Sequence, residues 1–386
     1  MNDVAVVGVG LGRFGNRSDV SFREIAFEAA SKAFDDAGIS PKDIDFTISS
    51  IAFPEALTSQ SSPAATVVDY LGLVSKGSMR VEAACASGSA AIRAGYSAIK
   101  AGLVNTVLIL GVEKMNEVSP IEAIECLARA SDVQLEYEPY GITFAGFYAM
   151  MARMHMSKYG TTEEDLAKVA VKNHKYGAMN EFAHLRKTIS IDDVLKSRVV
   201  ASPLKLYDCS PITDGAACVI LSDADNARKI TDTPIWLTGL GAAAEEAYFA
   251  AKSDLASVNG ARQAADLAYK MAKVKPSDID VAEVHDCFTI AELMAYEDLR
   301  FCEKGQGPSM IRDGQTEIGG KLPVNLDGGL KAKGHPIGAT GVAMTVEITR
   351  QLRGECKNRQ APKAEIGLTH NVGNTGQYCF VHIYSR

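Results

Sequence analysis

The sequence predicts an α/β protein made of two similar halves, with a helix-rich insertion in the first half. A helix, turn and strand pattern occurs twice along the chain, and several apolar runs are typical of buried strands. The chain has 386 residues, of which 47% are hydrophobic and 23% are charged. A chain of that size can form two domains or one large domain built twice.

The first half opens with the apolar run "DVAVVGVG", which predicts a buried strand. The amphipathic pattern "FREIAFEAASKAFDDAG" then predicts a helix that ends at a glycine, and "SPKDID" at 40–45 predicts a turn into the next strand. The run "TPIWLTGLGAA" opens the second half in the same way. There "ARQAADLAYKMA" repeats the helix, and "KPSDID" at 275–280 repeats the turn.

The later elements of the two halves also follow the same order. "CASG" leads into an Ala-rich helix and the strand "TVLILGVE", while "GHPIGATG" leads into a helix and the strand "AEIGLTHNVG". A helix-rich segment precedes the strand "GAACVILSD"; its Met residues are typical of core packing, and we expect it to cover a site. We therefore predict an N-terminal half (1–114 with 203–232), a loop domain (115–202) and a C-terminal half (233–386).

Composition argues against several classes of function. The net charge of -7, the pI near 5.6 and the lack of a Lys and Arg run argue against a nucleic-acid-binding surface. We find no signal peptide and no apolar run long enough for a membrane span. The eight cysteines (85, 126, 209, 218, 287, 302, 356 and 379) form no CxxC pair and the seven histidines no HExxH, so we expect reduced thiols, a cytoplasmic location and no metal.

A glycine pattern near the N-terminus suggests dinucleotide binding, but its context does not fit. Gly10, Gly12 and Gly15 satisfy GxGxxG after a strand. In the nucleotide-binding motif the helix begins within the glycine turn, whereas here "NRSDVS" intervenes and the helix is expected near Ser21. We therefore reject NAD binding and interpret the segment as a turn that borders the site.

Polar residues at the ends of four predicted strands suggest acyl transfer through a thioester. These residues are Cys85 in "CASG", His285 and Cys287 in "VHDCF", His335 in "GHPIGATG", and Gly373 in "HNVGNTG". A cysteine nucleophile needs a base, and loops of small residues let backbone N–H groups approach a developing oxyanion. Each residue alone is also compatible with a packed thiol or a loop-ordering histidine, but their joint occurrence at strand ends favours one shared site.

These segments resemble those of the thiolase family, and the resemblance covers essentially the whole chain. "GGLKAKGHPIGATG" resembles the thiolase histidine loop, and "VEAACASG" resembles the nucleophile loop. "EVHDCF" is similar to the sterol-carrier-protein-type and archaeal branch, where many other thiolases carry Asn-Glu-Ala-Phe. The resemblance implies a five-layered αβαβα fold of two repeated halves, with the insertion as a loop domain over the substrate.

The resemblance also implies a role for each site residue. Cys85 would carry the acyl group and His335 would activate it. His285 would bind the thioester oxygen in one oxyanion hole, and the backbone N–H groups of Cys85 and Gly373 would form another. Many thiolases have a second thiol in a Cys-x-Gly motif, where this chain has "NVG", so Cys287 becomes the candidate acid/base.

Three residues depart from the pattern of the relatives, two just before the histidine loop and one in "HNVGNTG". Leu326 and Asp327 replace a usual Pro-Ser, and Asn374 replaces a common glycine. We expect all three to alter the wall of the pocket, whereas the proposed chemical residues remain intact.

The implied activity is that of an acetyl-CoA C-acetyltransferase, which forms or cleaves acetoacetyl-CoA through an acyl-Cys85 thioester. The alternatives are a degradative thiolase for a bulkier aromatic or dicarboxylic 3-oxoacyl-CoA, and a non-catalytic or aldolase-like scaffold. The resemblance implies coenzyme A thioesters as substrates with no permanently bound cofactor. It also implies a homodimer or dimer of dimers, a small zinc-ribbon and OB-fold acyl-CoA-binding partner, and 3-hydroxy-3-methylglutaryl-CoA synthase as recipient of the product.

Overall fold

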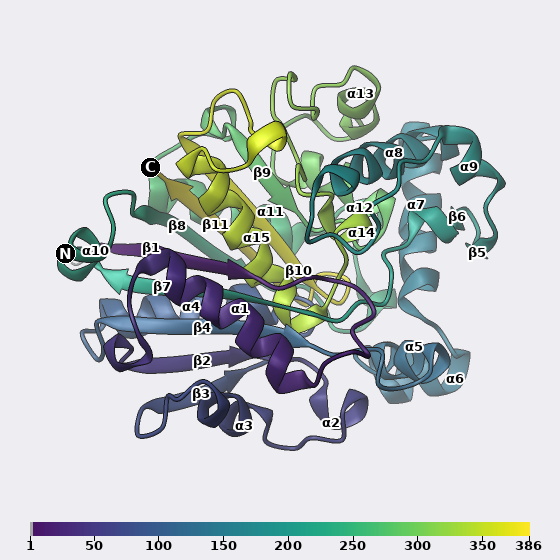
Figure 1. The fold of residues 1–386 in the computed structure, drawn as a ribbon. Helices are drawn as coiled ribbons and strands as arrows, with labels where there is room; N and C mark the ends of the chain where they lie inside the picture. Colours follow the sequence, from purple (N-terminus) through teal and green to yellow (C-terminus); the bar gives the residue numbers. More distant parts are fainter. Residues whose placement is uncertain (1–2) are drawn as a thin grey trace.

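A computed structural model describes residues 3–386 as one large sheet covered by helices (Figure 1). The sheet has nine strands in the order β3-β2-β4-β7-β1-β8-β11-β10-β9. Two short strands, β5 (Val199–Ala201) and β6 (Leu204–Lys205), form a separate hairpin. The strands of the large sheet are β1 (Val4–Leu11), β2 (Phe46–Ser50), β3 (Gly77–Val81), β4 (Thr106–Glu113), β7 (Gly215–Asp223), β8 (Ile235–Ala243), β9 (Val281–Val284), β10 (Ile366–Gly373) and β11 (Tyr378–Ser385).

The strand order shows the predicted repeat directly. In the first half the order β2-β4-β7-β1 matches β9-β10-β11-β8 in the second half, and the two halves meet where β1 pairs antiparallel with β8. The parallel pair of β2 and β3 has a reduced counterpart in the single parallel bridge between Ala282 and Val324. Both predicted turns form short 3₁₀ segments, Pro41–Asp43 and Pro276–Asp278, just before β2 and β9.

The helices form the layers that the resemblance implies. α4 and α15 pack on each other and contact strands of both halves, so they form a central layer between the first-half and second-half strands of the sheet. α1 covers β1 and β7, and α11 covers β8 and β11, as the two outer layers (Figure 1). The five-layered αβαβα prediction is confirmed. The helices are α1 (Phe22–Ala37), α2 (Pro54–Leu57), α3 (Pro63–Tyr70), α4 (Ser87–Lys100), α5 (Pro120–Ala128), α6 (Glu138–Tyr140), α7 (Phe144–Tyr159), α8 (Glu163–Met179), α9 (Ile191–Lys196), α10 (Ala224–Ile230), α11 (Asn259–Ala272), α12 (Thr289–Asp298), α13 (Gly307–Arg312), α14 (Gly329–Ala332) and α15 (Ile337–Arg353).

Local sequence signals set the ends of the first helix. Ser21 caps α1 in a capping box with Glu24, and Gly38 ends it with φ 64°, a left-handed conformation that suits glycine. The helix therefore begins after the glycine segment that had suggested a nucleotide site. Glycines on the opening strands serve packing instead: an added Cβ atom at Gly8 would lie 2.6 Å from the Ala33 carbonyl oxygen on α1.

The second half has the same close approach between its opening strand and its first helix. A Cβ atom at Gly239 on β8 would lie 2.5 Å from the Ala268 carbonyl oxygen on α11. α1 and α11 therefore lie against their strands at a distance that only glycine allows, which explains "GVGLG" and "TGLGA" as packing motifs. In the central layer, a Cβ atom at Gly88 on α4 would lie 2.8 Å from the Cα atom of Gly341 on α15.

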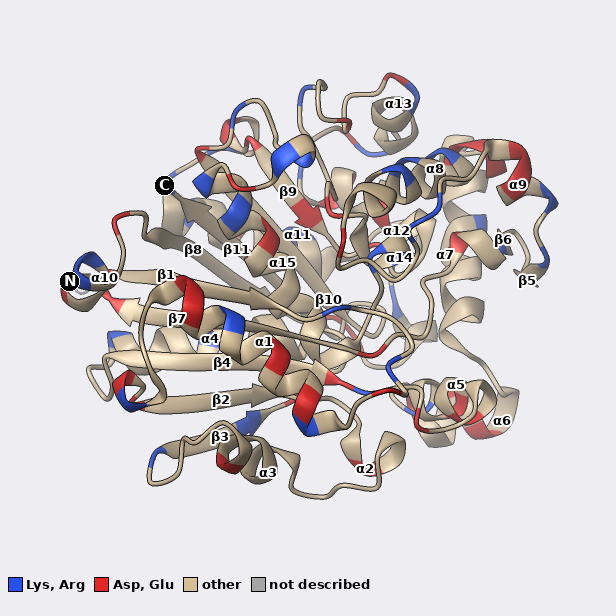
Figure 2. Cartoon of the chain, viewed as in Figure 1, with Lys and Arg blue, Asp and Glu red and all other residues tan. Residues whose placement is uncertain are grey.

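The segment between β4 and β7 contains the helices α5 to α9, as the sequence indicates for a helix-rich insertion. The division into 1–114 with 203–232, 115–202 and 233–386 stays a prediction. Charged residues of both signs are interspersed over the outer helices, whereas the central strands are largely uncharged (Figure 2). Among residues 3–386, no helix is both long enough and apolar enough to cross a membrane.

Candidate active site

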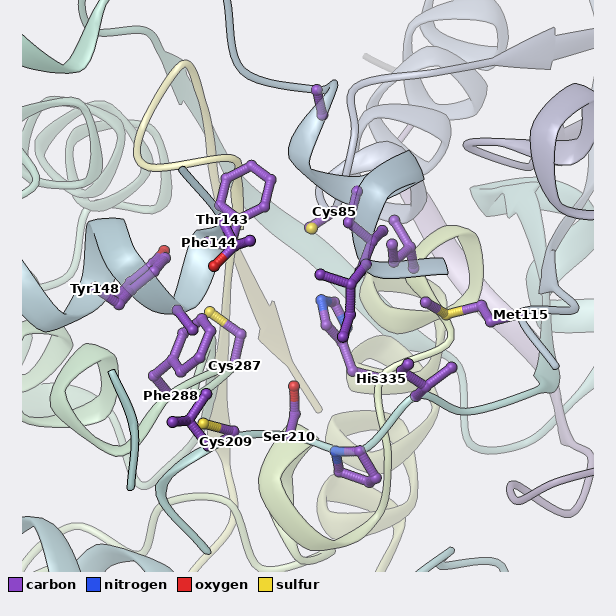
Figure 3. Close-up of a pocket in the computed structure, with 18 of the residues that line it drawn as sticks. Cys85, Met115, Thr143, Phe144, Tyr148, Cys209, Ser210, Cys287, Phe288 and His335 are labelled. Atoms are coloured by element: carbon purple, nitrogen blue, oxygen red, sulfur yellow. The ribbon is translucent and has the colours of Figure 1, made fainter. Parts of the chain in front are cut away.

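The predicted site residues converge on one cavity of about 450 Å³ between the strand ends and the insertion. Cys85, His285, Cys287 and His335 all line it, although they come from loops far apart in the sequence. Figure 3 shows Cys287 on one side and Cys85 and His335 on the other. The fifth predicted residue, Gly373, lies next to the lining residue Asn374.

The insertion supplies much of the apolar wall, as expected of a segment that covers a site. Helix α5 contributes Ile124 and Leu127, and α7 contributes Phe144 and Tyr148. Arg198, which is exposed, adds a cation to this wall. The other large apolar side chains of the lining are Phe53, Met115, Pro120, Val200, Leu206, Pro211, Ile212, Phe288 and Ile337.

A strained turn directs Cys85 into the cavity. Ala84 has φ 48°, a left-handed conformation that is uncommon for a residue with a Cβ atom. Ser87 holds this turn: the Ala83 N–H donates to its hydroxyl oxygen at 2.8 Å, and the hydroxyl donates to the Ala84 carbonyl oxygen at 2.6 Å. Helix α4 then begins at Ser87, so the thiol lies close to the N-terminus of that helix.

Cys85 is a neutral thiol in this environment. Burial raises its pKa to about 12, and the facing backbone N–H of Asn374 opposes that shift only in part. Because the thiolate is the nucleophilic form, Cys85 needs a base that removes its proton during attack.

His335 has the protonation state of such a base. Its Nδ1 atom lies 2.7 Å from the Thr340 hydroxyl oxygen, and that hydroxyl donates its own hydrogen to the Pro336 carbonyl oxygen at 3.0 Å. Nδ1 must therefore carry the hydrogen, which leaves the Nε2 lone pair free, without a hydrogen-bond partner in residues 3–386. Burial, with the charge of Lys333, lowers the pKa of His335 to about 3 and keeps the ring neutral.

His285 has the opposite tautomer. The Asn371 side chain faces both the Cys85 carbonyl oxygen at 3.0 Å and His285 Nδ1 at 3.1 Å. A carbonyl oxygen only accepts, so the facing atom is the amide nitrogen, which donates to Nδ1 and leaves the hydrogen of His285 on Nε2. Burial and the neighbouring His335 and His370 hold the pKa of His285 well below its usual range.

The two imidazoles are thus neighbours with different capacities. Their ring centroids lie 5.2 Å apart in an edge-to-face arrangement. His335 offers a proton acceptor, and His285 offers an N–H donor with no protein partner among the described residues. This pair suits a reaction in which a thiol loses a proton while a carbonyl oxygen gains negative charge.

Cys287 follows β9 and is 7% exposed. The Ser210 N–H donates to its carbonyl oxygen at 2.9 Å, which fixes the loop backbone. Burial, with the nearby Cys85, raises the pKa of Cys287 well above its usual value. A thiol of this kind serves as an acid directly and as a base once it has been deprotonated.

Gly373 lies at the end of β10, against the nucleophile loop. A Cβ atom there would lie 2.5 Å from the Ala83 carbonyl oxygen, so the approach requires glycine. The backbone N–H groups that face the Cys85 sulfur belong to Asn374 and to Cys85 itself. Asn374 has φ 58°, a conformation that asparagine tolerates better than most residues.

Only one of the three departures from the family pattern reaches the cavity wall. Asn374 lines the cavity, but the expectation for Leu326 and Asp327 is wrong, since neither belongs to its lining. Both are buried, and the Asp327 carboxylate forms an ion pair with Lys333 and accepts the Gly329 N–H at 2.8 Å. They shape the back of the histidine loop instead.

Sequence reasoning also missed three residues that orient the site, namely Thr340, Asn371 and Tyr148, and it singled out Asn374 only as a change in the pocket wall. Thr340 lies four residues after Pro336, the spacing at which a helical hydroxyl reaches a carbonyl oxygen, so this pattern could have been noticed. Asn371 and Tyr148 carry no such local signal, because their partners come from other loops.

Fold and geometry together define an α/β protein with two thiols and two neutral imidazoles of opposite tautomer around an apolar cavity. The family model "Thiolase, N-terminal domain" matches residues 4–225, and "Thiolase C-terminal domain-like" matches residues 241–386. The chain belongs to the thiolase family, and the prediction of a thiolase-type acyltransferase is confirmed.

Curated relatives match over nearly the whole chain. Acetyl-CoA acetyltransferase of Methanothermobacter thermautotrophicus is 46% identical over 386 residues, which is 100% of each chain. Sterol carrier protein 2 of Bos taurus is 35% identical over 97% of this chain and 71% of its own length. The predicted branch, which joins these two groups, is confirmed.

Solved structures agree on the fold. An Ltp2-ChsH2(DUF35) aldolase is 26% identical with a TM-score of 0.87, covering 99% of this chain and 98% of that chain. Human mitochondrial 3-ketoacyl-CoA thiolase has a TM-score of 0.77 at 17% identity, covering 100% of this chain and 99% of the other. At that identity the second likeness shows the fold alone.

Proposed function

We propose that the protein is an acetyl-CoA C-acetyltransferase that forms or cleaves acetoacetyl-CoA through an acetyl-Cys85 thioester. The observation that carries the proposal is the pair of fixed tautomers, because it places a proton acceptor and an N–H donor in the same cavity as two thiols. The full-length similarity to acetyl-CoA acetyltransferases supports the choice of substrate.

In the first half-reaction, Cys85 Sγ attacks the carbonyl carbon of one acetyl-CoA. His335 Nε2 takes the thiol proton and returns it to the departing coenzyme A sulfur, so the imidazole ends neutral. Backbone N–H groups near Cys85, including that of Asn374, stabilise the oxyanion that forms during attack. Gly373 allows the close approach of these two loops.

In the second half-reaction, the Cys287 thiolate takes a proton from the methyl carbon of a second acetyl-CoA. The Nε2–H of His285 donates to the thioester oxygen of this molecule as it becomes an enolate oxygen. The enolate carbon then attacks the acetyl carbon on Cys85, and the C–S bond to Cys85 breaks. The proton that Cys287 gained passes to the released Cys85 sulfur, which restores the Cys85 thiol and the Cys287 thiolate. Coenzyme A thioesters are the substrates throughout, and the proposal includes no permanently bound cofactor.

Mass spectrometry tests the central step. After incubation with acetoacetyl-CoA, the protein should carry one acetyl group, mapped to Cys85. An adduct on Cys287 or on another residue would overturn the assignment.

A second candidate is a degradative thiolase for a bulkier 3-oxoacyl-CoA. The cavity of about 450 Å³ with an apolar wall favours it, because an acetyl group fills little of that space. Turnover with acetoacetyl-CoA compared with aromatic and dicarboxylic 3-oxoacyl-CoAs separates the two. A non-catalytic or aldolase-like scaffold would have no use for both thiols and both oriented imidazoles.

The assembly and location are further parts of the proposal. β3 (Gly77–Val81) ends the sheet with exposed residues, an edge that suits pairing with a second copy in a homodimer or dimer of dimers. The similarity to an Ltp2-ChsH2(DUF35) aldolase, whose name joins two proteins, supports a partner protein for this chain. We propose that this partner is a small zinc-ribbon and OB-fold acyl-CoA-binding protein, and copurification tests this. We also propose that the product passes to 3-hydroxy-3-methylglutaryl-CoA synthase. A cytoplasmic location is proposed as well, because all eight cysteines are free thiols.

A further inference from the structure

Tyr148 connects the insertion to both sides of the catalytic cavity. It lies on α7, is 2% exposed, and its ring stacks on Phe288 with centroids 4.8 Å apart. Its hydroxyl donates to the Asn374 carbonyl oxygen at 3.1 Å. Figure 3 shows Tyr148 on the same side of the cavity as Cys287 and Phe288.

Tyr148 also lies near Cys287, because both line the same cavity and the tyrosine ring stacks on Phe288, the next residue in the chain. Burial raises the pKa of Tyr148 well above its usual value, and the hydrogen-bonding contact with Cys287 adds to the rise, so the phenol stays protonated. The contact acts on Cys287 in the opposite direction and lowers the pKa of the thiol against the effect of burial. A tyrosine hydroxyl has one hydrogen and also accepts, so it can serve either protonation state of a neighbouring thiol.

We propose that Tyr148 is a positioning residue that supports Cys287 as the proton acceptor of the condensation step. While Cys287 is a thiol, the Tyr148 hydroxyl donates to the Asn374 carbonyl oxygen and accepts from the S–H group. When Cys287 passes its proton to the released Cys85 sulfur, the Tyr148 hydroxyl turns and donates to Cys287 Sγ. This role rests on the proposed function, because it assigns Tyr148 a part in the second half-reaction.

Two other ionisable groups act on the Cys287 thiol. Cys85, across the cavity, and Asp286, next in sequence, both favour the neutral thiol. The Phe288 N–H and the Tyr148 hydroxyl favour the thiolate. Tyr148 is therefore a side chain that offsets part of the effect of burial at Cys287.

The test is Tyr148→Phe, which keeps the ring on Phe288 and removes only the hydroxyl. Hydrogen bonds to charged groups are worth enough to predict a loss of about 10- to 100-fold in condensation of acetyl-CoA and in deuterium exchange at its methyl group. The pH at which exchange reaches half its maximum should rise by about one unit. Acetylation of Cys85 by acetyl-CoA should fall by much less than condensation and exchange, because the hydroxyl reaches the first half-reaction only through the Asn374 backbone.

Tyr269→Phe is the matched control. Tyr269 is also buried, belongs to the same core cluster, and donates its hydroxyl hydrogen to the Leu299 carbonyl oxygen at 2.8 Å, but it does not line the cavity. This control should retain the condensation rate and pH profile of the parent. Replacing Tyr148 by 3-fluorotyrosine, a stronger donor, should move the half-maximum to lower pH, which tests the idea without removing the group.

Two results would overturn the role of Tyr148. One is an exchange rate and pH profile in Tyr148→Phe that match those of Tyr269→Phe. The other is an equal loss of Cys85 acetylation and exchange, which indicates a general disturbance of the cavity. These results differ from the one expected if the proposed function is wrong, because in that case the parent protein itself would carry no acetyl group on Cys85.

Discussion

The two halves of the molecule use equivalent positions for different chemistry. α4 and α15 occupy the same place in each half, and Cys85 and His335 each lie two residues before the first residue of their helix, Ser87 and Ile337. The repeated frame thus brings the thiol of one half to the base of the other. A duplicated fold can build a two-part site by changing one residue at each of two equivalent loops.

The neighbouring strand ends differ more strongly. β4 and β10 both have eight residues, and Glu113 ends the first where Gly373 ends the second. The Glu113 carboxylate accepts the N–H groups of Ala52 and Gly338 at 2.8 and 2.9 Å and joins the two halves. Gly373 presents bare backbone to the nucleophile loop. Glu113 therefore has a structural role in the first half, whereas Gly373, at the equivalent position of the second half, lies beside the cavity.

The largest expected effect comes from removing the nucleophile of the first half. Cys85→Ser should abolish acyl transfer, by about 10⁴-fold or more, because a serine hydroxyl lacks an accessible anionic form. The acetyl adduct seen by mass spectrometry should vanish, while circular dichroism and the unfolding midpoint match those of the parent. A Cys85→Ser protein that still turns over acetoacetyl-CoA would place the nucleophile elsewhere.

The next largest effects are expected at Cys287 and at His335, which is the second-half residue equivalent to Cys85. Loss of one acid/base group costs about 10²- to 10⁴-fold. Cys287→Ala should still give a burst of Cys85 acetylation from acetyl-CoA but fail in condensation, whereas His335→Ala should slow the burst as well. Rapid quench with labelled acetyl-CoA separates these cases. If Cys287→Ala condenses at a near-parental rate, the buried His370 becomes the next residue to test.

Sequence patterns predicted the repeat and the strand-end loops because both depend on local signals. Capping at Ser21, the two Asp-containing turns and the apolar strand runs are each encoded within a few residues. The tautomers could not be predicted, since they depend on where Asn371 meets Cys85 and His285 in space. The failure at Leu326 and Asp327 has the same origin: closeness to His335 in sequence did not place them in the cavity wall.

A smaller effect should separate the two imidazoles. Thr340→Val removes the acceptor for His335 Nδ1–H, and Asn371→Ala removes the donor to His285 Nδ1. Each change should lower the rate of the affected step about tenfold, which corresponds to the free energy of roughly one hydrogen bond. Thr340→Val should slow Cys85 acetylation, whereas Asn371→Ala should slow methyl-proton exchange by more than it slows acetylation. Identical kinetic defects in the two variants would argue against distinct roles.

The smallest effect is expected at Glu113, the first-half residue equivalent to Gly373. Burial raises the pKa of Glu113 from 4.5 to about 7, despite three backbone N–H donors. Between those values the folded protein holds a proton that the unfolded chain has lost, so this residue makes stability fall as pH rises from 4.5 to 7.

Across this pH range the contribution of Glu113 to the free energy of unfolding should fall by about 3 kcal/mol in total, at roughly 1.4 kcal/mol per unit of pKa difference. Glu113→Gln has no such titration, so the stability of parent minus variant should decline across this range when unfolding in urea is followed at pH 5, 6 and 7. A constant offset for Glu113→Gln across the three pH values would mean that Glu113 is already ionised in the folded protein at pH 5, and that the three N–H groups outweigh burial at this end of β4.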